Sequence, residues 1–250
     1  MPTRPWLRSA PAVAISALLC LPGRALAGPP FLTDDPEPVE LGHWEINIAS
    51  LGQWTSADRN GTAPHVDANY GVFEDVQLHA QPAMAYDHPA DGQGHYGVGD
   101  CELGIKWRFL HEEGVLPQLS LYPLLELPLG NQKLGLGSGR TQAFLPLWIQ
   151  KSYEHWTSYG GGGYWINPGV GNRNYVFLGW VLQREVCEGL QLGGEIYHAT
   201  ASTSGGSRTT GFNLGGTGDL DAHLHVLFSG GRTVSGPRVF TSYIGLQLTI

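Results

Sequence analysis

The stretch Val98–Leu110, VGDCELGIKWRFL, alternates apolar and charged side chains with a period of two residues. Its odd-numbered positions are apolar from Cys101 to Phe109, and its even-numbered positions carry all of its acidic and basic side chains. Successive side chains of a β-strand point to opposite faces of a sheet, so the pattern predicts a strand with one apolar and one charged face. About ten residues is long for a strand of a soluble sandwich, but it is the length that crosses a membrane. If the remaining chain repeats the pattern, the fold is an outer-membrane β-barrel.

The chain repeats this pattern from residue 42 onward, in twelve segments. We expect strands at 42–54, 63–71, 76–88, 97–110, 115–128, 140–152, 155–167, 174–184, 189–201, 208–218, 221–229 and 238–250. Short connections alternate with longer Gly-, Asn- and Ser-rich loops, which include 55–62 and 230–237. Short periplasmic turns and longer external loops alternate in this way in outer-membrane barrels. The sequence therefore predicts an all-β fold, a transmembrane antiparallel up-and-down β-barrel of about 12 strands that spans residues 42–250.

The first 27 residues have the features of a secretory signal peptide. Arg4 and Arg8 precede an apolar run at about 10–21, and residues 25–27 form a small-x-small cleavage pattern. A dozen apolar residues are too few to cross about 30 Å of hydrocarbon, which argues against a membrane anchor. We expect cleavage after Ala27 and localisation in the bacterial outer membrane. The expected partners are outer-membrane lipid, lipopolysaccharide and, during biogenesis, the barrel-assembly machinery.

Composition and charge narrow the function further. Charged residues make up 14% of the chain, below the roughly 25% of soluble domains. Removal of residues 1–27 takes away three of the 14 basic residues and none of the 22 acidic ones. The remaining acidic balance excludes a nucleic-acid-binding function. Cys101 and Cys187 are the cysteines that remain, and the predicted topology puts them near opposite ends of the barrel, so no disulfide is expected.

Residues 28–41, GPPFLTDDPEPVEL, contain four prolines and four acidic residues. Proline fixes φ and provides no hydrogen-bond donor, so this segment is expected to be extended and irregular. Two interpretations stay open. The segment is either a loose periplasmic leader or a plug that partly occludes the periplasmic mouth, in which Asp34, Asp35 and Glu37 meet basic side chains of the lumen.

Four stretches are similar to a family of outer-membrane proteins that is named after the MetA pathway of phenol degradation. They are FLTDDPEPVELGHWEIN (31–47), GVGDCELGIKWRF (97–109), GLGSG (135–139) and GGGGYWINPG (160–169). The resemblance covers nearly all of the mature chain. It implies an outer-membrane barrel that transports small aromatic or apolar solutes, and it carries over no catalytic residue.

The charged faces of the predicted strands point into the lumen. We expect the lumen to be lined by Glu45, His79, Asp100, Glu102, Lys106, Arg108, Glu126, Glu195, His223 and His225. These charges either hydrogen-bond across a filled interior or line a wet channel. Twelve strands lie between the eight that side chains can fill and the sixteen that leave an aqueous pore, which favours a narrow passage.

Two histidines of this set suggest a metal site. His223 and His225 share one face of the predicted strand 221–229, with His79 and Glu45 at a comparable height. A metal normally needs three or four converging ligands with supporting hydrogen bonds, and this set does not clearly supply them. We expect neither a metal nor a cofactor.

Two further function classes are alternatives to a channel. His198 lies on the predicted lipid face near the serines of 202–207, as in a lipid hydrolase embedded in a barrel. Nucleophilic catalysis also needs a group that orients the histidine, and no Asp or Glu lies at that rim. We therefore expect no catalytic residue and no enzyme. A structural barrel scaffold without transport remains the other alternative.

Overall fold

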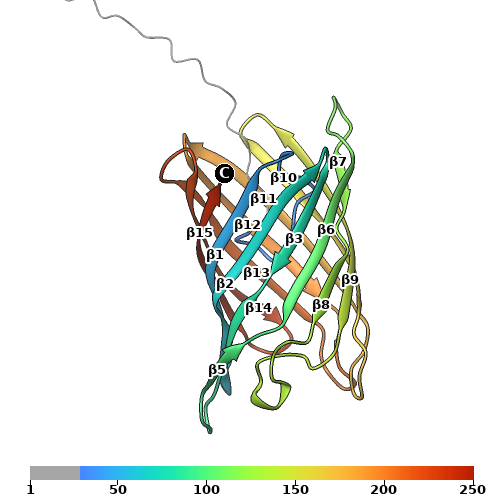
Figure 1. Ribbon diagram of the computed structural model, residues 1–250, viewed down its shortest axis with the longest axis vertical. Coiled ribbons are helices and arrows are strands. Elements are labelled where there is room, and N and C mark those ends of the chain that lie inside the picture. Colours follow the sequence, from blue (N-terminus) through green and yellow to red (C-terminus); the bar gives the residue numbers. More distant parts are fainter. Residues whose placement is uncertain (1–28) are drawn as a thin grey trace, which may run out of the picture.

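The computed structural model describes residues 29–250, so the predicted signal peptide and its cleavage site lie outside the described residues. The described strands form one closed antiparallel sheet, in which β1 pairs with both β2 and β15 (Figure 1). The elements are β1 (Trp44–Trp54), β2 (Asp58–Phe73), β3 (Val76–Gln81), β4 (Ala83–Pro89), β5 (His95–Val98), β6 (Cys101–Leu110), β7 (Gln118–Leu121), β8 (Leu124–Leu127), the 3-10 helix η1 (Gln132–Leu134), β9 (Gln142–Tyr153), β10 (Trp156–Ile166), β11 (Tyr175–Cys187), β12 (Leu190–Ala199), β13 (Thr209–Asp219), β14 (Leu224–Ser235) and β15 (Phe240–Thr249). Within residues 29–250 no helix is long and apolar enough to cross a bilayer.

Three of the barrel's strands each consist of two segments. Pro82 separates β3 from β4, Gly99 and Asp100 separate β5 from β6, and Tyr122 and Pro123 separate β7 from β8. Proline lacks the N–H group that a ladder needs, which explains two of the three interruptions. The barrel therefore has twelve antiparallel strands, and the predicted fold class is confirmed.

Two predicted loops are shorter in the structure. The loop expected at 55–62 is a tight turn, because β2 begins at Asp58 and pairs with β1 from Arg59 onward. The loop expected at 230–237 shrinks because β14 continues to Ser235. Both extensions contain Gly together with Asn, Ser or Thr, which composition assigns to loops. A ladder accepts these residues where neighbouring strands supply hydrogen-bond partners.

The two ends of the barrel differ in their connections. The start of β1, the C-terminus and the tightest turns lie at one end, which is at the top of Figure 1. By the rule for outer-membrane barrels this end is periplasmic, and the end with the loops after β8 and β12 is external. Cys101 begins β6 at the external end and Cys187 ends β11 at the periplasmic end. Both cysteines are free in the structure.

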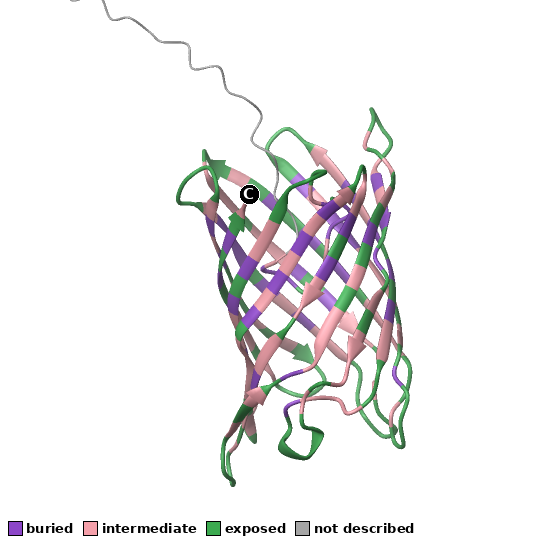
Figure 2. Cartoon of the chain, viewed as in Figure 1, coloured by how far each residue is buried: buried purple, intermediate pink, exposed green. Residues whose placement is uncertain are grey.

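The inner and outer faces of the barrel follow the predicted alternation (Figure 2). On β6, Leu103 and Trp107 are exposed on the outside, whereas Lys106 is buried in the lumen. On β9, Leu147 is exposed and Trp148 is buried. Exposed apolar side chains contact lipid in a membrane barrel. The packed interior is therefore the lumen, and the candidate functional site lies there.

Candidate functional site: the barrel lumen

The lumen contains two cavities of about 1070 Å³ and about 390 Å³. The larger one opens at the periplasmic end, where His43 and Ile250 line it. The smaller one lies at the external end, beneath loop residues 135–137. The side chains that line both are Leu51, Gln53, His65, Gln81 and Glu102. These side chains form the boundary between the two cavities along the barrel axis.

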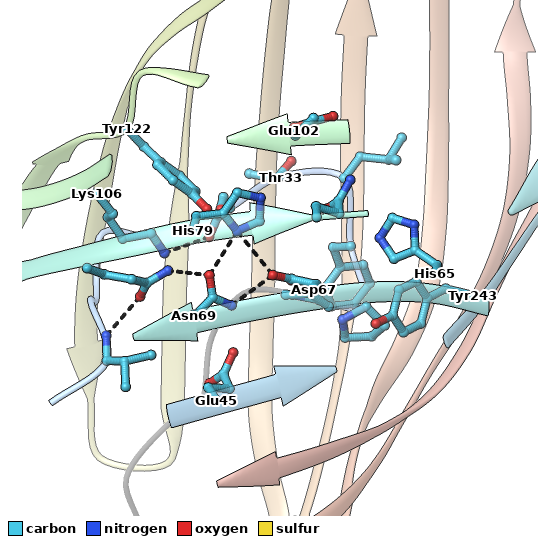
Figure 3. A pocket seen from close by; sticks show the side chains of 18 of the residues that line it. Thr33, Glu45, His65, Asp67, Asn69, His79, Glu102, Lys106, Tyr122 and Tyr243 are labelled. Carbon is cyan, nitrogen blue, oxygen red and sulfur yellow. Dashed lines mark hydrogen bonds and ion pairs between the residues drawn. The ribbon is translucent and has the colours of Figure 1, made fainter. Parts of the chain in front are cut away.

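One side of the larger cavity is a polar wall, which we define as the lumen-facing Glu45, Asn47, Asp67, Asn69, Gln77, His79, Glu102 and Lys106 of β1, β2, β3 and β6. Strand register brings the members together, since Asn69 is paired with both Glu45 and His79. His79 Nδ1 lies 2.8 Å from Asn69 Oδ1 and 3.1 Å from Asp67 Oδ1 (Figure 3). Asn69 Nδ2 donates to Asp67 Oδ1 at 2.9 Å. The wall is a connected network of polar groups.

The lining of the same cavity continues in an aromatic wall, which we define as Tyr122, Phe144, Trp165 and Phe177. All four line the larger cavity. Phe144 and Trp165 are register partners on β9 and β10, and their rings stack with centroids 4.8 Å apart. Phe177 meets Phe144 edge to face at 6.3 Å. The two walls adjoin at Tyr122, whose ring centre lies 5.0 Å from Lys106 Nζ and 5.6 Å from the His79 ring.

The N-terminal segment, residues 29–41, lies inside the lumen. Thr33 and Asp35 have no exposed surface. The backbone N–H and the hydroxyl of Thr33 both donate to Glu195 Oε1 at 2.6 Å. On the other side, Lys106 Nζ donates to Asp34 Oδ1 at 3.0 Å and lies 3.8 Å from Asp35 Oδ2. The segment is therefore fixed between β12 and β6.

The N-terminal segment reaches deeper than the sequence predicts. Glu195 lies near the middle of β12, and Ser229, near the middle of β14, donates from its hydroxyl to the Pro30 carbonyl at 2.6 Å. Phe31 packs against the buried Tyr159 and Val181. The predicted position at the periplasmic mouth is thus too shallow, because apolar packing at Phe31 adds to the acidic contacts that sequence reasoning considered.

The main partner of Arg108 is Asp75 and not an acidic residue of the N-terminal segment. Its guanidinium donates to Asp75 Oδ1 through Nε at 2.9 Å and Nη2 at 2.8 Å, while Glu37 lies 3.8 Å away. Asp75 is in the turn between β2 and β3, where His111 Nε2 is 2.7 Å from its other oxygen. Partial burial opposes ionisation, but the hydrogen bonds from Arg108 and His111 lower the pKa of Asp75.

The other predicted lumen residues have separate positions. Asp100 accepts from the backbone N–H groups of Gly130 and Ser138 at 2.9 and 2.5 Å and so holds the external loop 128–141. Glu126 accepts from Gln142 Nε2 at 2.8 Å. Both acids line the smaller cavity, at the external end.

The two histidines of the predicted strand 221–229 do not share a strand face. His223 lies in the turn before β14 and is exposed, because the strand begins only at Leu224. His225 is buried and its Nδ1 lies 2.7 Å from Asp219 Oδ1. Among residues 29–250 no group of three or more His, Cys, Asp or Glu is arranged to hold a metal ion.

The hydrolase alternative rests on His198. Its Nδ1 lies 2.8 Å from the Thr210 hydroxyl on the neighbouring strand β13. The backbone of the 202–207 segment forms hydrogen bonds within its own loop and with the 167–174 loop. The contacts around His198 therefore pair it with a threonine rather than with a serine nucleophile.

Sequence reasoning missed Asp67 and the aromatic wall. The alternation that puts Leu145 and Leu147 on the lipid face also puts Phe144 and Trp148 in the lumen. The same pattern therefore predicts aromatic side chains in the lumen at β9. Asp67 is harder to find, because its neighbours on β2 include few large apolar residues that would identify the outer face.

No protein-family model and no curated protein matches the sequence. The fold is similar to solved outer-membrane structures. The COG4313 outer membrane channel from Pseudomonas putida F1 superposes with a TM-score of 0.72 and 15% identity over 86% of this chain and 98% of that chain. The KdgM porin matches with a TM-score of 0.57 and 10% identity over 81% and 98%. The translocator domain of autotransporter NalP from Neisseria meningitidis matches at 0.52 and 12% over 85% and 90%. At these identities the likeness shows the fold, which is the closed antiparallel β-barrel that these outer-membrane proteins share.

Proposed function

We propose that the protein is a narrow outer-membrane channel for small amphipathic solutes, in particular those with an aromatic ring. The observation that carries this proposal is the aromatic wall that adjoins a polar wall in the lining of one cavity of about 1070 Å³. Small-molecule sites typically have volumes of about 300–1000 Å³ and combine an apolar lining with a few placed polar groups. The outer membrane channel and the porin with similar folds support a transport role.

Each wall has a distinct role in this proposal. A solute ring stacks on Phe144 or Trp165, and aromatic pairs contribute about 0.5–1.5 kcal/mol beyond their buried area. A hydroxyl or carbonyl on the same solute exchanges hydrogen bonds with His79 or Glu102 on the adjoining polar wall. Contacts of this strength select a solute and still release it, which conduction requires.

We further propose that the N-terminal segment limits passage. Its docking between Glu195 and Lys106 places it across the middle of the lumen. Deletion of residues 30–38 in the mature chain is therefore expected to raise single-channel conductance in planar bilayers. In liposomes, uptake of phenol-sized aromatic solutes should exceed uptake of aliphatic polyols of equal size. Equal uptake of the two solute classes by an open barrel would contradict the proposed selectivity, and unchanged conductance in the folded deletion variant would contradict the proposed role of the segment.

Ion selectivity gives an independent measure of the charge that lines the lumen. Acidic side chains such as Glu45, Asp67 and Glu102 outnumber the one buried cation, Lys106, along the larger cavity. Like charge raises the barrier to entry of an anion. Reversal potentials under a salt gradient are expected to show cation preference. Anion preference would mean that Lys106 and Arg108 dominate the constriction.

The proposed route to the membrane includes removal of residues 1–27. The sequence supports this with a basic start, an apolar run and a small-x-small site before Gly28. Intact mass of the protein from isolated outer membranes should correspond to a chain that begins at Gly28. A mass that includes residues 1–27 would contradict the proposed processing.

A further inference from the structure

A row of five outward-facing residues crosses five strands near the external end of the barrel. The order along the row is Phe212, Arg232, Phe240, Trp54 and Arg59, on β13, β14, β15, β1 and the start of β2, and each member is the register partner of the next. We call this set the external arginine row. Residues directly opposite each other on neighbouring strands point to the same face and are in contact range.

The row faces the outside of the barrel. Gln53 and Thr241 line the lumen cavity, so their sequence neighbours Trp54 and Phe240 point outward. Phe240 is 58% exposed, and both Arg232 and Arg59 are exposed. In the membrane this face contacts lipid at the level of the external head groups. Aromatic side chains are typical of that level, whereas exposed arginine needs an anionic partner or water there.

The two arginines differ from the cations at the other levels of the barrel. Lys106, Arg108 and Lys151 each lie within 3.0 Å of a carboxylate oxygen. Within residues 29–250 neither Arg59 nor Arg232 takes part in an ion pair.

Acidic residues are scarce around the row. Between residues 196 and 250 the acids are Asp219 and Asp221, which lie at the periplasmic end of β13 and in the turn after it. Asp58 is next to Arg59 in sequence, but it accepts a hydrogen bond from Thr55 instead. The two guanidinium groups therefore have their donors free for an anion from outside the chain.

We propose that the external arginine row binds the head group of an outer-leaflet glycolipid that carries two phosphates, with Arg232 and Arg59 each contacting one phosphate. The two arginines are three strands apart, which corresponds to about 14 Å at the usual strand spacing. Guanidinium binds phosphate with paired, charge-assisted hydrogen bonds. Phe212, Phe240 and Trp54 supply apolar contacts beside the acyl chains, which favours a lipid over a soluble phosphate.

The chain offers a matched control at its periplasmic end. Arg184 on β11 also faces outward beside an aromatic side chain, with its guanidinium 5.2 Å from the Trp156 ring centre. The Arg184 site has one arginine, whereas the external arginine row has two. Arg184 also lies at the level of the opposite leaflet. A general effect of removing a lipid-facing arginine would appear at Arg184 as well.

The test measures lipid binding to the mature chain in nonionic detergent by native mass spectrometry. The probes are bis-phosphorylated lipid A, monophosphorylated lipid A and phosphatidylglycerol. The double variant Arg59→Gln/Arg232→Gln is expected to bind bis-phosphorylated lipid A at least about tenfold more weakly, because it loses the charge-assisted hydrogen bonds to both phosphates. Arg184→Gln is expected to bind it as the unmodified chain does. The shift in gel mobility on heating confirms that each variant is a folded barrel.

Three results would overturn the proposal. The first is unchanged lipid A binding by the folded double variant. The second is an equal loss in Arg184→Gln. The third is equal affinity of the unmodified chain for phosphatidylglycerol and bis-phosphorylated lipid A. Weaker binding of monophosphorylated lipid A than of the bis-phosphorylated form supports the two-phosphate assignment.

Discussion

The polar wall and the aromatic wall are built on strands of the same kind but are stabilised differently. The polar wall is connected by hydrogen bonds among Asp67, Asn69 and His79, and its cation Lys106 reaches the N-terminal segment. The aromatic wall is held by ring packing, with Phe144 and Trp165 stacked at 4.8 Å. The polar wall therefore depends on charge and on a segment from outside the sheet, whereas the aromatic wall depends on shape. Substitutions that remove one kind of contact should affect one wall and leave the other intact.

The largest effect is expected from Lys106→Met on the polar wall. Lys106 is buried and its Nζ lies 3.0 Å from Asp34 Oδ1 and 3.8 Å from Asp35 Oδ2. Removing one partner of a buried ion pair typically costs about 3–5 kcal/mol, because the remaining charge is left uncompensated. The N-terminal segment is expected to undock. Protease cleavage within residues 29–41 and single-channel conductance should both increase.

Lys151→Met is the control for this prediction. Lys151 Nζ lies 2.9 Å from Glu112 Oε1, but the pair is at the periplasmic surface and partly exposed. An exposed pair is worth about 0.2–1 kcal/mol, so conductance should not change. If both variants increase conductance equally, the contact between Lys106 and the N-terminal segment is not what holds that segment in place.

A smaller effect is expected from Trp165→Ala on the aromatic wall. Trp165 is half-buried and stacks between Phe144 and Tyr175, whose ring centroids are 4.8 and 5.8 Å away. We expect a loss of about 2–3 kcal/mol in the free energy of unfolding, below the 3–5 kcal/mol of a fully buried Trp. Uptake of aromatic solutes into liposomes should fall several-fold, while cation preference stays unchanged.

Tyr164→Ala provides the comparison on the outer face of the same strand. Tyr164 is 45% exposed and adjacent to Trp165 in sequence, so its side chain points to lipid. Its replacement should leave solute uptake unchanged. An equal fall in uptake in both variants would mean that the aromatic wall does not select the solute.

The outer face of the barrel could be predicted from the sequence because contact with lipid requires an apolar side chain at every second residue of a strand. On β6 this alternation correctly placed Leu103 and Trp107 outside and Lys106 inside. The same rule does not say which lumen residues meet. The contact between Asn69 and His79 depends on how far each strand is displaced along the barrel, and that displacement follows from hydrogen-bond register.

The errors at single residues have local causes. The alternation of His223 with His225 predicts a strand at both residues, but a bend continues to residue 223, so His223 lines the larger cavity from the turn before β14. The predicted depth of the N-terminal segment considered only its charges. Phe31, which packs against Tyr159 and Val181, draws the segment further in, and an isolated Phe in a proline-rich stretch gives no periodic signal.

The smallest effect is expected from Asp75→Asn. Asp75 forms a partly exposed charged contact near the polar wall, so this substitution measures how much such a contact contributes to the free energy of unfolding. Asp75 adopts a left-handed conformation with φ 63°, which asparagine also tolerates, so the turn should persist. The substitution weakens the bonds from Arg108 and His111, at 2.8 and 2.7 Å, and should cost about 1 kcal/mol near pH 7. Because the folded-state pKa of Asp75 is lowered, its stabilisation is present above the ordinary carboxyl pKa of about 3.9 and is lost as the pH falls through the lowered value. Urea unfolding of both proteins at pH 7, 5 and 2 should therefore show a smaller difference at pH 2 than at the two higher values. A difference that is undiminished at pH 2 would show that the contribution of Asp75 comes from the shape of the turn and not from its charge.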